Sequence, residues 1–222
     1  MFAQRTVEPE LLDSLPQDHP DALHNRRDLR RLNALTGNFR WLASQVGQHV
    51  TTGLRLLEIG AGEGCLGAYL NRRGILPDSV TVDGLDVIAR PATWPEQWTW
   101  HQGDLTRFDG YAHYDGIVAN LILHQFDNAV LQQLGQRWRA AGMRLVLSCE
   151  TQRCPWQMRG LPLLAAVTRM NYVSRHDAAV SLRGGFRRGE LGALLGLETP
   201  EWTVRETTPA LRSHRLCAVR HS

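Results

Sequence analysis

The chain has 222 residues, of which 43% are hydrophobic and 21% are charged. This composition excludes a disordered chain, and the length favours one α/β domain over two small ones. The 25 basic and 22 acidic side chains give a formal net charge of +3. That charge is too small to indicate a nucleic acid or a membrane as the partner.

No apolar run approaches the roughly 20 residues that a membrane-spanning helix needs. Residues 1–10 lack the basic and apolar regions of a secretory signal. The four cysteines form no Cys-x-x-Cys pair, so neither a zinc site nor a redox motif is indicated. We therefore expect no metal and a reducing, cytoplasmic location.

The first predicted elements are two helices, because apolar residues recur at helical spacing over 21–35 and 39–50. Short apolar runs then predict five strands, and helices are expected between some of them, over 65–73 and 128–140. The predicted strands are residues 54–59, 80–85, 98–101, 114–119 and 143–149.

The end of the chain has a different pattern. A helix is predicted over 186–197, and two strands follow over 202–206 and 216–219 with no helix between them, which is typical of an antiparallel hairpin. The predicted fold class is therefore α/β, with a doubly wound, mostly parallel, seven-stranded sheet that ends in this hairpin. We expect two parts: an N-terminal helical extension or lid over 1–50, and a cofactor-binding domain over 51–222.

A glycine cluster, Gly60-Ala-Gly62-Glu-Gly64, follows the first predicted strand. Glycine lets the backbone turn sharply and approach a ligand, and ligands of such sheets lie beyond the carboxyl ends of the strands. A dinucleotide pattern G-x-G-x-x-G that begins at Gly60 fails, because Cys65 occupies the third glycine position. The same pattern fits from Gly62 but starts late after the strand. The loop alone leaves the ligand open, and a tight turn without a ligand also fits.

Four segments, each at the end of a predicted strand, resemble the motifs of class I S-adenosylmethionine-dependent methyltransferases. The resemblance extends over roughly residues 54–221 and implies a Rossmann-like methyltransferase fold with S-adenosylmethionine as cofactor. The opening segment, RRDLRRLNALTG, is also similar to a small bacterial subgroup that acts on small molecules. The matching segments are LLEIGAGEG (56–64), GLDV (84–87), QGDL (102–105) and YDGIVANLILHQF (114–126).

The resemblance also implies which residues bind the cofactor. Glu58 and the glycine loop would hold the methionine and ribose parts, Asp86 would accept hydrogen bonds from the ribose hydroxyls, and Asp104 would contact the adenine amino group. Taken singly, each fits a structural role as well, such as an Asx turn at Asp104. The complete implied set is Glu58, Gly60, Ala61, Gly62, Gly64, Asp86, Val87, Asp104, Leu105, Asn120 and Leu121.

The residues after the fourth strand bear on the acceptor. The family's Asn/Asp-Pro-Pro-aromatic motif for amino-group methylation of bases is absent, and Asn120-Leu-Ile-Leu stands in its place. An oxygen acceptor such as a phenol must lose a proton, and histidine can accept one near neutral pH. His124 and His176 are therefore candidate catalytic bases, although a structural role fits each of them equally well.

An insertion after the fifth predicted strand is the candidate acceptor site. Trp156, Arg159 and His176 are its predicted substrate contacts, with Trp156 as an aromatic wall. The alternative is an amphipathic helix that packs on the sheet.

The predicted function is methyl transfer from S-adenosylmethionine to a small-molecule acceptor, with oxygen favoured over nitrogen. Three alternatives stay open: an RNA or protein methyltransferase, a cofactor-binding module without chemistry, and a nicotinamide oxidoreductase. A nucleic-acid partner would need a contiguous basic face, which the net charge does not require. The sequence predicts no oligomeric state.

Overall fold

The computed structural model describes residues 4–49, 53–74, 76–77, 79–209 and 213–221. Within them, seven strands form one mixed sheet in the order β3-β2-β1-β4-β5-β7-β6. All are parallel except β7, which runs antiparallel to both β5 and β6. This confirms the predicted doubly wound sheet and its closing hairpin. The strands are β1 Arg55–Ile59, β2 Thr81–Asp86, β3 Trp100–Gln102, β4 Gly116–Asn120, β5 Leu145–Glu150, β6 Trp202–Thr207 and β7 His214–Arg220.

Seven α-helices and three short 3-10 helices surround this sheet in the described part of the chain. The 3-10 helices are η1 Leu12–Ser14, η2 Gly110–His113 and η3 Leu123–Gln125. The α-helices are α1 Pro20–Thr36, α2 Asn38–His49, α3 Cys65–Arg72, α4 Asn128–Ala140, α5 Pro155–Thr168, α6 Tyr172–Gly184 and α7 Glu190–Leu194.

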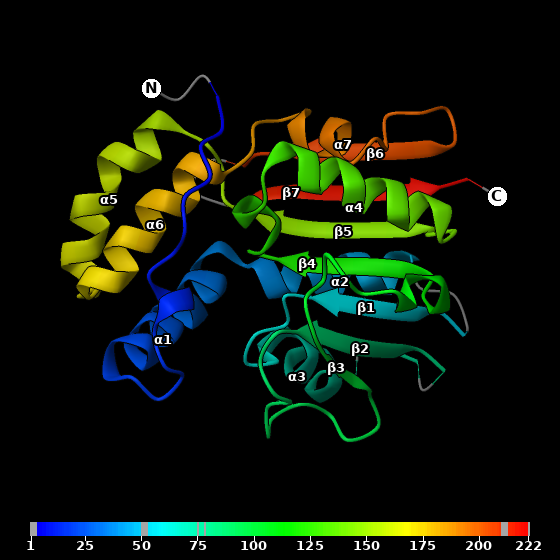
Figure 1. The fold of residues 1–222 in the computed structure, drawn as a ribbon, viewed down its shortest axis with the longest axis horizontal. Helices are drawn as coiled ribbons and strands as arrows, with labels where there is room; N and C mark the ends of the chain where they lie inside the picture. The colour runs from blue at the N-terminus through cyan, green and yellow to red at the C-terminus, as the bar shows by residue number, and fades with distance from the viewer. Residues whose placement is uncertain (1–3, 50–52, 75, 78, 210–212, 222) are drawn as a thin grey trace.

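The sheet is buried on both faces, which explains its apolar strands. One core combines side chains of α4 and α7 with one face of the sheet, and the fully buried Trp138 is its largest member. A second core lies on the opposite face and includes Leu42 and Val46 of α2 and Leu66 of α3. Figure 1 shows α4 and α7 in front of the sheet and α2 behind it.

The helices α1, α5 and α6 form a separate group beyond the carboxyl ends of the central strands, on the left of Figure 1. Helix α6 packs against α1, α5 and η3, so this group is joined to the end of β4. The insertion predicted after the fifth strand thus consists of two helices, and α5 packs on α6 rather than on the sheet.

Helix α2 shares a core with the sheet, whereas α1 belongs to the outer group. The boundary predicted between residues 50 and 51 lies outside the described residues. The division into a lid over 1–50 and a domain over 51–222 stays a prediction.

The helix predicted over 186–197 is shorter in the structure. Gly189 and Gly196 have φ angles of 85° and 63°, in the left-handed region, and they lie on either side of α7. Phe186, at the predicted start, instead pairs with Gln152 in an isolated β-bridge and is fully buried.

Candidate active site

The register of the sheet brings the predicted motifs together. Ile59 at the end of β1 lies opposite Leu85 of β2 and Ala119 of β4, and Asp86 lies opposite Gln102 of β3. Because these strands are parallel, the segments that follow them meet at one edge of the sheet. The order of the strands reverses between β1 and β4, which is where ligands of doubly wound sheets bind.

The glycine loop after β1 needs its glycines for two reasons. Gly60, Gly62 and Gly64 have φ angles of 61°, 53° and 69°, a region that costs other residues roughly 1–2 kcal/mol. A Cβ atom on Gly60 would lie 2.4 Å from Cγ1 of Ile122, whereas one on Gly62 would meet no described atom within 4 Å. Gly60 is therefore packed against the turn after β4, while Gly62 faces open space.

Asp86 holds this loop in place. Its Oδ2 accepts a hydrogen bond from the Gly62 amide at 2.8 Å, and its Oδ1 accepts one from the Ile88 amide at 3.1 Å. A carboxylate has about four acceptor sites, so Asp86 can accept further hydrogen bonds from a bound ligand.

Glu58 is buried at the same edge. Its side chain is 3% exposed, and Oε2 has no hydrogen-bond partner among the described residues. Burial raises the pKa of this carboxyl to about 8; a hydrogen bond from the Gly67 amide opposes the shift and the Asp86 charge adds to it. Oδ1 of Asn120, at the end of β4, is a second buried acceptor that the described residues leave unpaired.

The residues after β3 make local hydrogen bonds within their own turn. Oδ1 of Asp104 accepts hydrogen bonds from the Thr106 amide and hydroxyl, both at 2.8 Å, so the local turn considered for this residue is present. Leu105 is buried and Val87 is 66% exposed. The adenine contacts of these residues stay a prediction.

The turn after β4 has a strained backbone. Leu121 has a φ angle of 58°, which is rare for a side chain of this kind and costs about 1–3 kcal/mol. The Leu121 amide donates to the Cys149 carbonyl at 2.8 Å, and Ile122 presses on Gly60. The predicted wall residues Asn120 and Leu121 therefore lie next to the glycine loop.

His124 is fixed between two carboxylates. Its Nδ1 lies 2.8 Å from Oε2 of Glu150 and its Nε2 lies 3.3 Å from Oε1 of Glu10. Burial alone would lower the pKa of His124, but the hydrogen bonds with Glu10 and Glu150 raise it to about 9. An imidazole that already carries its proton at neutral pH does not accept another, so this arrangement argues against the predicted base role of His124.

His176 is more accessible. Its side chain is 42% exposed, and Nδ1 lies 3.0 Å from Oδ1 of Asp177. Asp177 is buried and also accepts the amides of Leu11 and Leu12 at 2.7 and 3.1 Å, so it fastens the N-terminal segment to α6. Asp177 is thus neither a free partner of His176 nor a solvated helix cap.

The other predicted substrate contacts lie on α5. Trp156 is 44% exposed and Arg159 is exposed as well. Their helix belongs to the group beyond the carboxyl ends of the strands, where the cofactor site is predicted, and lies off the sheet faces (Figure 1). Their contact with an acceptor stays a prediction.

The main feature that the sequence patterns did not indicate is the N-terminal strap, residues 4–15, which crosses α6 and η3. Arg5 donates to the carbonyls of Gly184 and Phe126 at 2.8 and 2.9 Å, and the Thr6 amide donates to the Arg183 carbonyl at 3.2 Å. These contacts join residues more than 100 positions apart, so no local sequence pattern predicts them.

Asp13, on η1 of this strap, is a further acidic group that was not predicted. Burial, and then the charges of Glu10, Asp177 and Asp86, raise its pKa to about 6. Asp86, whose carboxylate holds the glycine loop, is thus among the charges that act on Asp13. Helix α1 approaches the same loop, because Arg30 forms an ion pair with Glu63 of the glycine loop.

Two absences are relevant to the site. In the described ranges, no group of three or more His, Cys, Asp or Glu side chains could hold a metal ion. No helix in those ranges is long and apolar enough to span a membrane.

Comparison with known proteins gives similarity in structure and none in sequence. Neither known family patterns nor curated protein sequences match this chain. The solved structure of the plantazolicin methyltransferase BpumL, in complex with a triazolic desmethylPZN analog and SAH, has a TM-score of 0.69 at 11% identity. The match covers 95% of this chain and 93% of that one.

Two other solved structures extend the range of similar proteins. A putative O-methyltransferase from Nostoc punctiforme has a TM-score of 0.59 at 14% identity, over 91% of this chain and 61% of that one. A small RNA methyltransferase has a TM-score of 0.61 at 15% identity, over 84% of this chain and 25% of that one. The fold of this chain is therefore that of the class I S-adenosylmethionine-dependent methyltransferases, as the motifs implied.

Proposed function

We propose that this chain transfers a methyl group from S-adenosylmethionine to a small-molecule acceptor, with an oxygen nucleophile such as a phenol as the expected acceptor. The observation that carries the proposal is the buried Glu58 carboxyl with its unpaired oxygen, beside the glycine loop and Asp86. A buried polar atom left without a partner costs about 1–3 kcal/mol, so a ligand that supplies a hydrogen-bond partner there is favoured.

The charge of this edge supports the same cofactor. Asp86 and Asp13 carry carboxyl groups near the loop, and Asn120 adds an unpaired acceptor oxygen. Acceptors suit the ribose hydroxyls and the ammonium group of S-adenosylmethionine, and acidic groups suit its net positive charge. They suit the pyrophosphate of a nicotinamide dinucleotide poorly, which disfavours the oxidoreductase alternative.

In this proposal, Asp86 accepts hydrogen bonds from the ribose hydroxyls and Glu58 binds near the amino-acid end. Gly62 leaves the space that a bound ribose would fill, and Asn120 and Leu121 form the wall beside the reactive group. The cofactor, once bound, supplies a methyl group already activated on a sulfonium. The protein contributes mainly by orienting the acceptor and excluding water, which can be worth several kcal/mol.

The acceptor would bind between this edge and the helices α1, α5 and α6, with contacts from Trp156, Arg159 and His176. A phenol or hydroxyl acceptor requires a base. His176 is the accessible histidine of this region, and Asp13 offers a carboxylate whose pKa of about 6 suits a base near neutral pH. The free cysteines agree with the reducing, cytoplasmic location that we propose for the enzyme.

A transfer assay with cofactor labelled in its methyl group tests the proposal. The purified chain is offered phenols, hydroxy acids and amines in one series, and transcribed small RNA and basic proteins in another. We expect label on an oxygen of a small molecule. Label on RNA or protein would contradict the proposal. Binding of the cofactor without transfer of label to any acceptor would also contradict it.

The same assay compares the two candidate bases on whichever acceptor is found. His176→Ala or Asp13→Asn should lower kcat by about 10²–10⁴ if the residue is the base, with little change in cofactor affinity. Full turnover by both variants across pH would exclude both residues as the base.

A further inference from the structure

Glu150 is an unusual residue for the last position of a buried strand. Its side chain is 0% exposed, and its carboxylate accepts hydrogen bonds from three successive amides of the turn after β4. Those of Ile122 and Leu123 lie at 3.3 and 3.0 Å and that of His124 at 3.3 Å. Successive backbone amides that donate to one buried carboxylate are fixed in place by it.

The backbone that Glu150 fixes is the wall of the predicted cofactor site. The turn begins at the strained Leu121, and its Ile122 side chain occupies the space that a Cβ on Gly60 would take. A strained conformation persists only when its surroundings determine it. The Cys149 carbonyl holds the Leu121 amide, and the carboxylate of Glu150 holds the next three amides of the turn.

The same carboxylate is linked to the N-terminal strap through His124. The His124 ring lies between Glu150 and Glu10, and Glu10 also accepts from the Ser181 hydroxyl at 2.5 Å and from the side-chain amide of Gln125 at 3.1 Å. Burial would raise the pKa of Glu10, but its hydrogen bond to His124 holds it below the usual value.

Charged groups from each neighbouring element surround this histidine. Glu150 comes from β5, and Glu10, Asp13 and Arg5 come from the strap. Helix α6 contributes the neutral Ser181, which donates to Glu10, and the carboxylate of Asp177, whose charge acts on Asp13. Arg5 donates to the His124 carbonyl at 3.3 Å. Two buried carboxylates on opposite sides of one ring favour its positively charged form, because a buried charge without a partner of opposite sign is costly.

We propose that Glu150 is a positioning residue for the cofactor site: together with a protonated His124 and Glu10, it holds the turn at 120–124 and the N-terminal strap in one arrangement beside that site. Cofactor affinity and the order of the strap are then coupled, although Glu150 touches no substrate. The part that concerns the cofactor rests on the proposed function, whereas the coupling of turn and strap does not.

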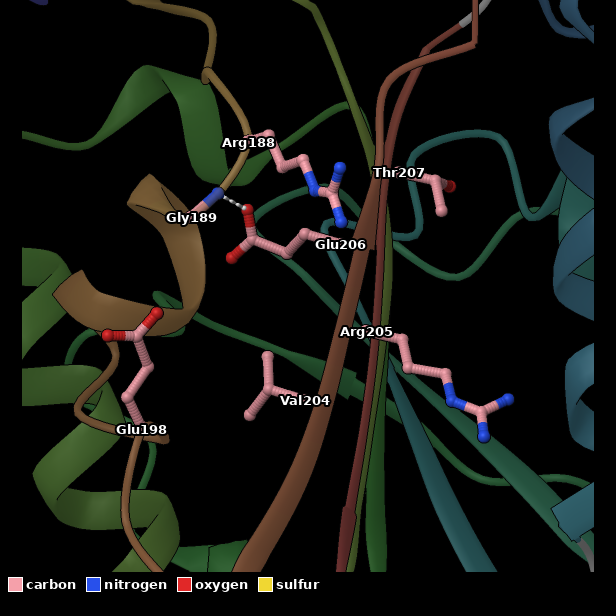
Figure 2. A pocket seen from close by; sticks show the side chains of 7 residues that line it. All are labelled: Arg188, Gly189, Glu198, Val204, Arg205, Glu206 and Thr207. Carbon is pink, nitrogen blue, oxygen red and sulfur yellow. Dashed lines mark hydrogen bonds between the residues drawn. The ribbon is translucent and has the colours of Figure 1, made fainter.

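A matched control lies on β6, the outermost strand on one side of the sheet. Glu206 of β6 is also buried, accepts the amides of Gly189 and Gly192 at 2.5 Å each, and lies 2.9 Å from Nε2 of the buried His214. Figure 2 shows the Glu206 side chain directed at Gly189, in a pocket lined by β6 residues and by residues that precede and follow α7. Glu206→Gln therefore removes the same kind of anion as Glu150→Gln, away from the predicted cofactor site.

The experiment compares the full-length variants Glu150→Gln, Glu10→Gln and Glu206→Gln with the unchanged chain. One readout is the affinity for S-adenosylhomocysteine; the other is the rate of tryptic cleavage after Arg5, which needs the strap to detach. We expect both Glu150→Gln and Glu10→Gln to weaken binding and to accelerate the cleavage by about tenfold or more. Glu206→Gln should lower stability but change neither readout by more than about twofold.

A pH series adds a readout that loss of stability alone would not produce. The pKa of His124 is raised in the folded chain, so the stabilisation by its charge is complete below its ordinary value of 6.5 and is lost as pH rises through about 9. Cleavage after Arg5, normalised to an unfolded sample, should therefore accelerate over this range in the unchanged chain and not in Glu10→Gln.

Glu10→Gln keeps the test decisive if Glu150→Gln does not fold, because Glu10 lies on the strap rather than within the sheet. The inference is overturned if the folded variants match Glu206→Gln in both readouts, or if cleavage shows no dependence on pH. If the unchanged chain does not bind S-adenosylhomocysteine, the proposed function fails, and the cleavage readout still tests the coupling.

Discussion

At the scale of single residues, Glu58 provides a prediction about stability. Its pKa is raised to about 8 by burial, so folding favours the protonated carboxyl and this contribution is lost as pH rises from about 4.5 through 8. Glu58→Gln cannot ionise, so the free energy of unfolding of the variant relative to the unchanged chain should increase across that range. Urea titrations at several pH values measure the difference, and parallel curves for the two chains would show that burial does not perturb Glu58.

Gly62 provides a prediction about the ligand. Gly62 and Gly74 both have positive φ angles, of 53° and 56°, and a Cβ on either meets no described atom within 4 Å. Alanine at each should therefore lower stability by a similar amount, about 1–2 kcal/mol. Only Gly62→Ala should weaken binding of S-adenosylhomocysteine, by about tenfold or more, because its methyl group occupies the space proposed for the ribose. Calorimetry on both variants checks this, and equal affinities would show that the cofactor does not bind beside the glycine loop.

The sequence predicted these residues because each lies at or just after the end of a strand, where local pattern and position in the fold coincide. Glu58, Gly60 and Asp86 were found in this way. Glu10 and Glu150 were not, since Glu10 meets His124 across 114 positions and Glu150 meets it across 26. A contact of that separation has no local pattern, and the motif placed His124 near the reacting atoms without indicating what would surround it.

At the scale of elements, Asp177 is one of the residues that fasten the strap to α6. Its two oxygens accept the amides of Leu11 and Leu12 and the side-chain amide of Asn25, at 2.7 to 3.1 Å. Asp177→Asn puts an amide group where an acceptor is needed, so it should lower the free energy of unfolding by about 1–3 kcal/mol.

Asp127→Asn is the control for that prediction. Asp127 caps α4 by accepting the Val130 amide at 2.9 Å in an exposed position, where asparagine caps equally well. Urea unfolding should show little change for Asp127→Asn. Equal losses in the two variants would mean that Asp177 does not fasten the strap.

Elements were predicted well where burial in the sheet sets their pattern. The alternation of strands and helices was sufficient for β1, β2, β4 and β5 and for the closing hairpin. The pair α5 and α6 was not resolved from the sequence, because α5 is apolar on exposed positions such as Leu163 and Val167 and so lacks a helical contrast between faces. The predicted helix over 186–197 failed for another reason, since Gly189 and Gly196 adopt left-handed conformations that limit α7.

At the scale of the whole molecule, a single sheet lies between two layers of helices. Acidic groups gather at the carboxyl ends of its strands, where the strand order reverses. The helices α1, α5 and α6 and the strap extend beyond those ends (Figure 1). The fold was predictable because the motifs end successive strands along the chain, and the parallel strands of a doubly wound sheet bring those ends together. The acceptor was not, because its proposed site is formed by helices from both ends of the chain.

The most direct test of the account is calorimetric titration of the full chain with S-adenosylhomocysteine and, separately, with NAD. We expect saturable binding of one S-adenosylhomocysteine per chain and no comparable binding of NAD. Asp86→Asn should weaken the binding by about 1–3 kcal/mol. Asp115→Asn should not, because Asp115 accepts the Arg55 amide at 2.9 Å where β1 begins, at the opposite edge of the sheet. Absence of binding at millimolar S-adenosylhomocysteine, or tighter binding of NAD, would contradict the account.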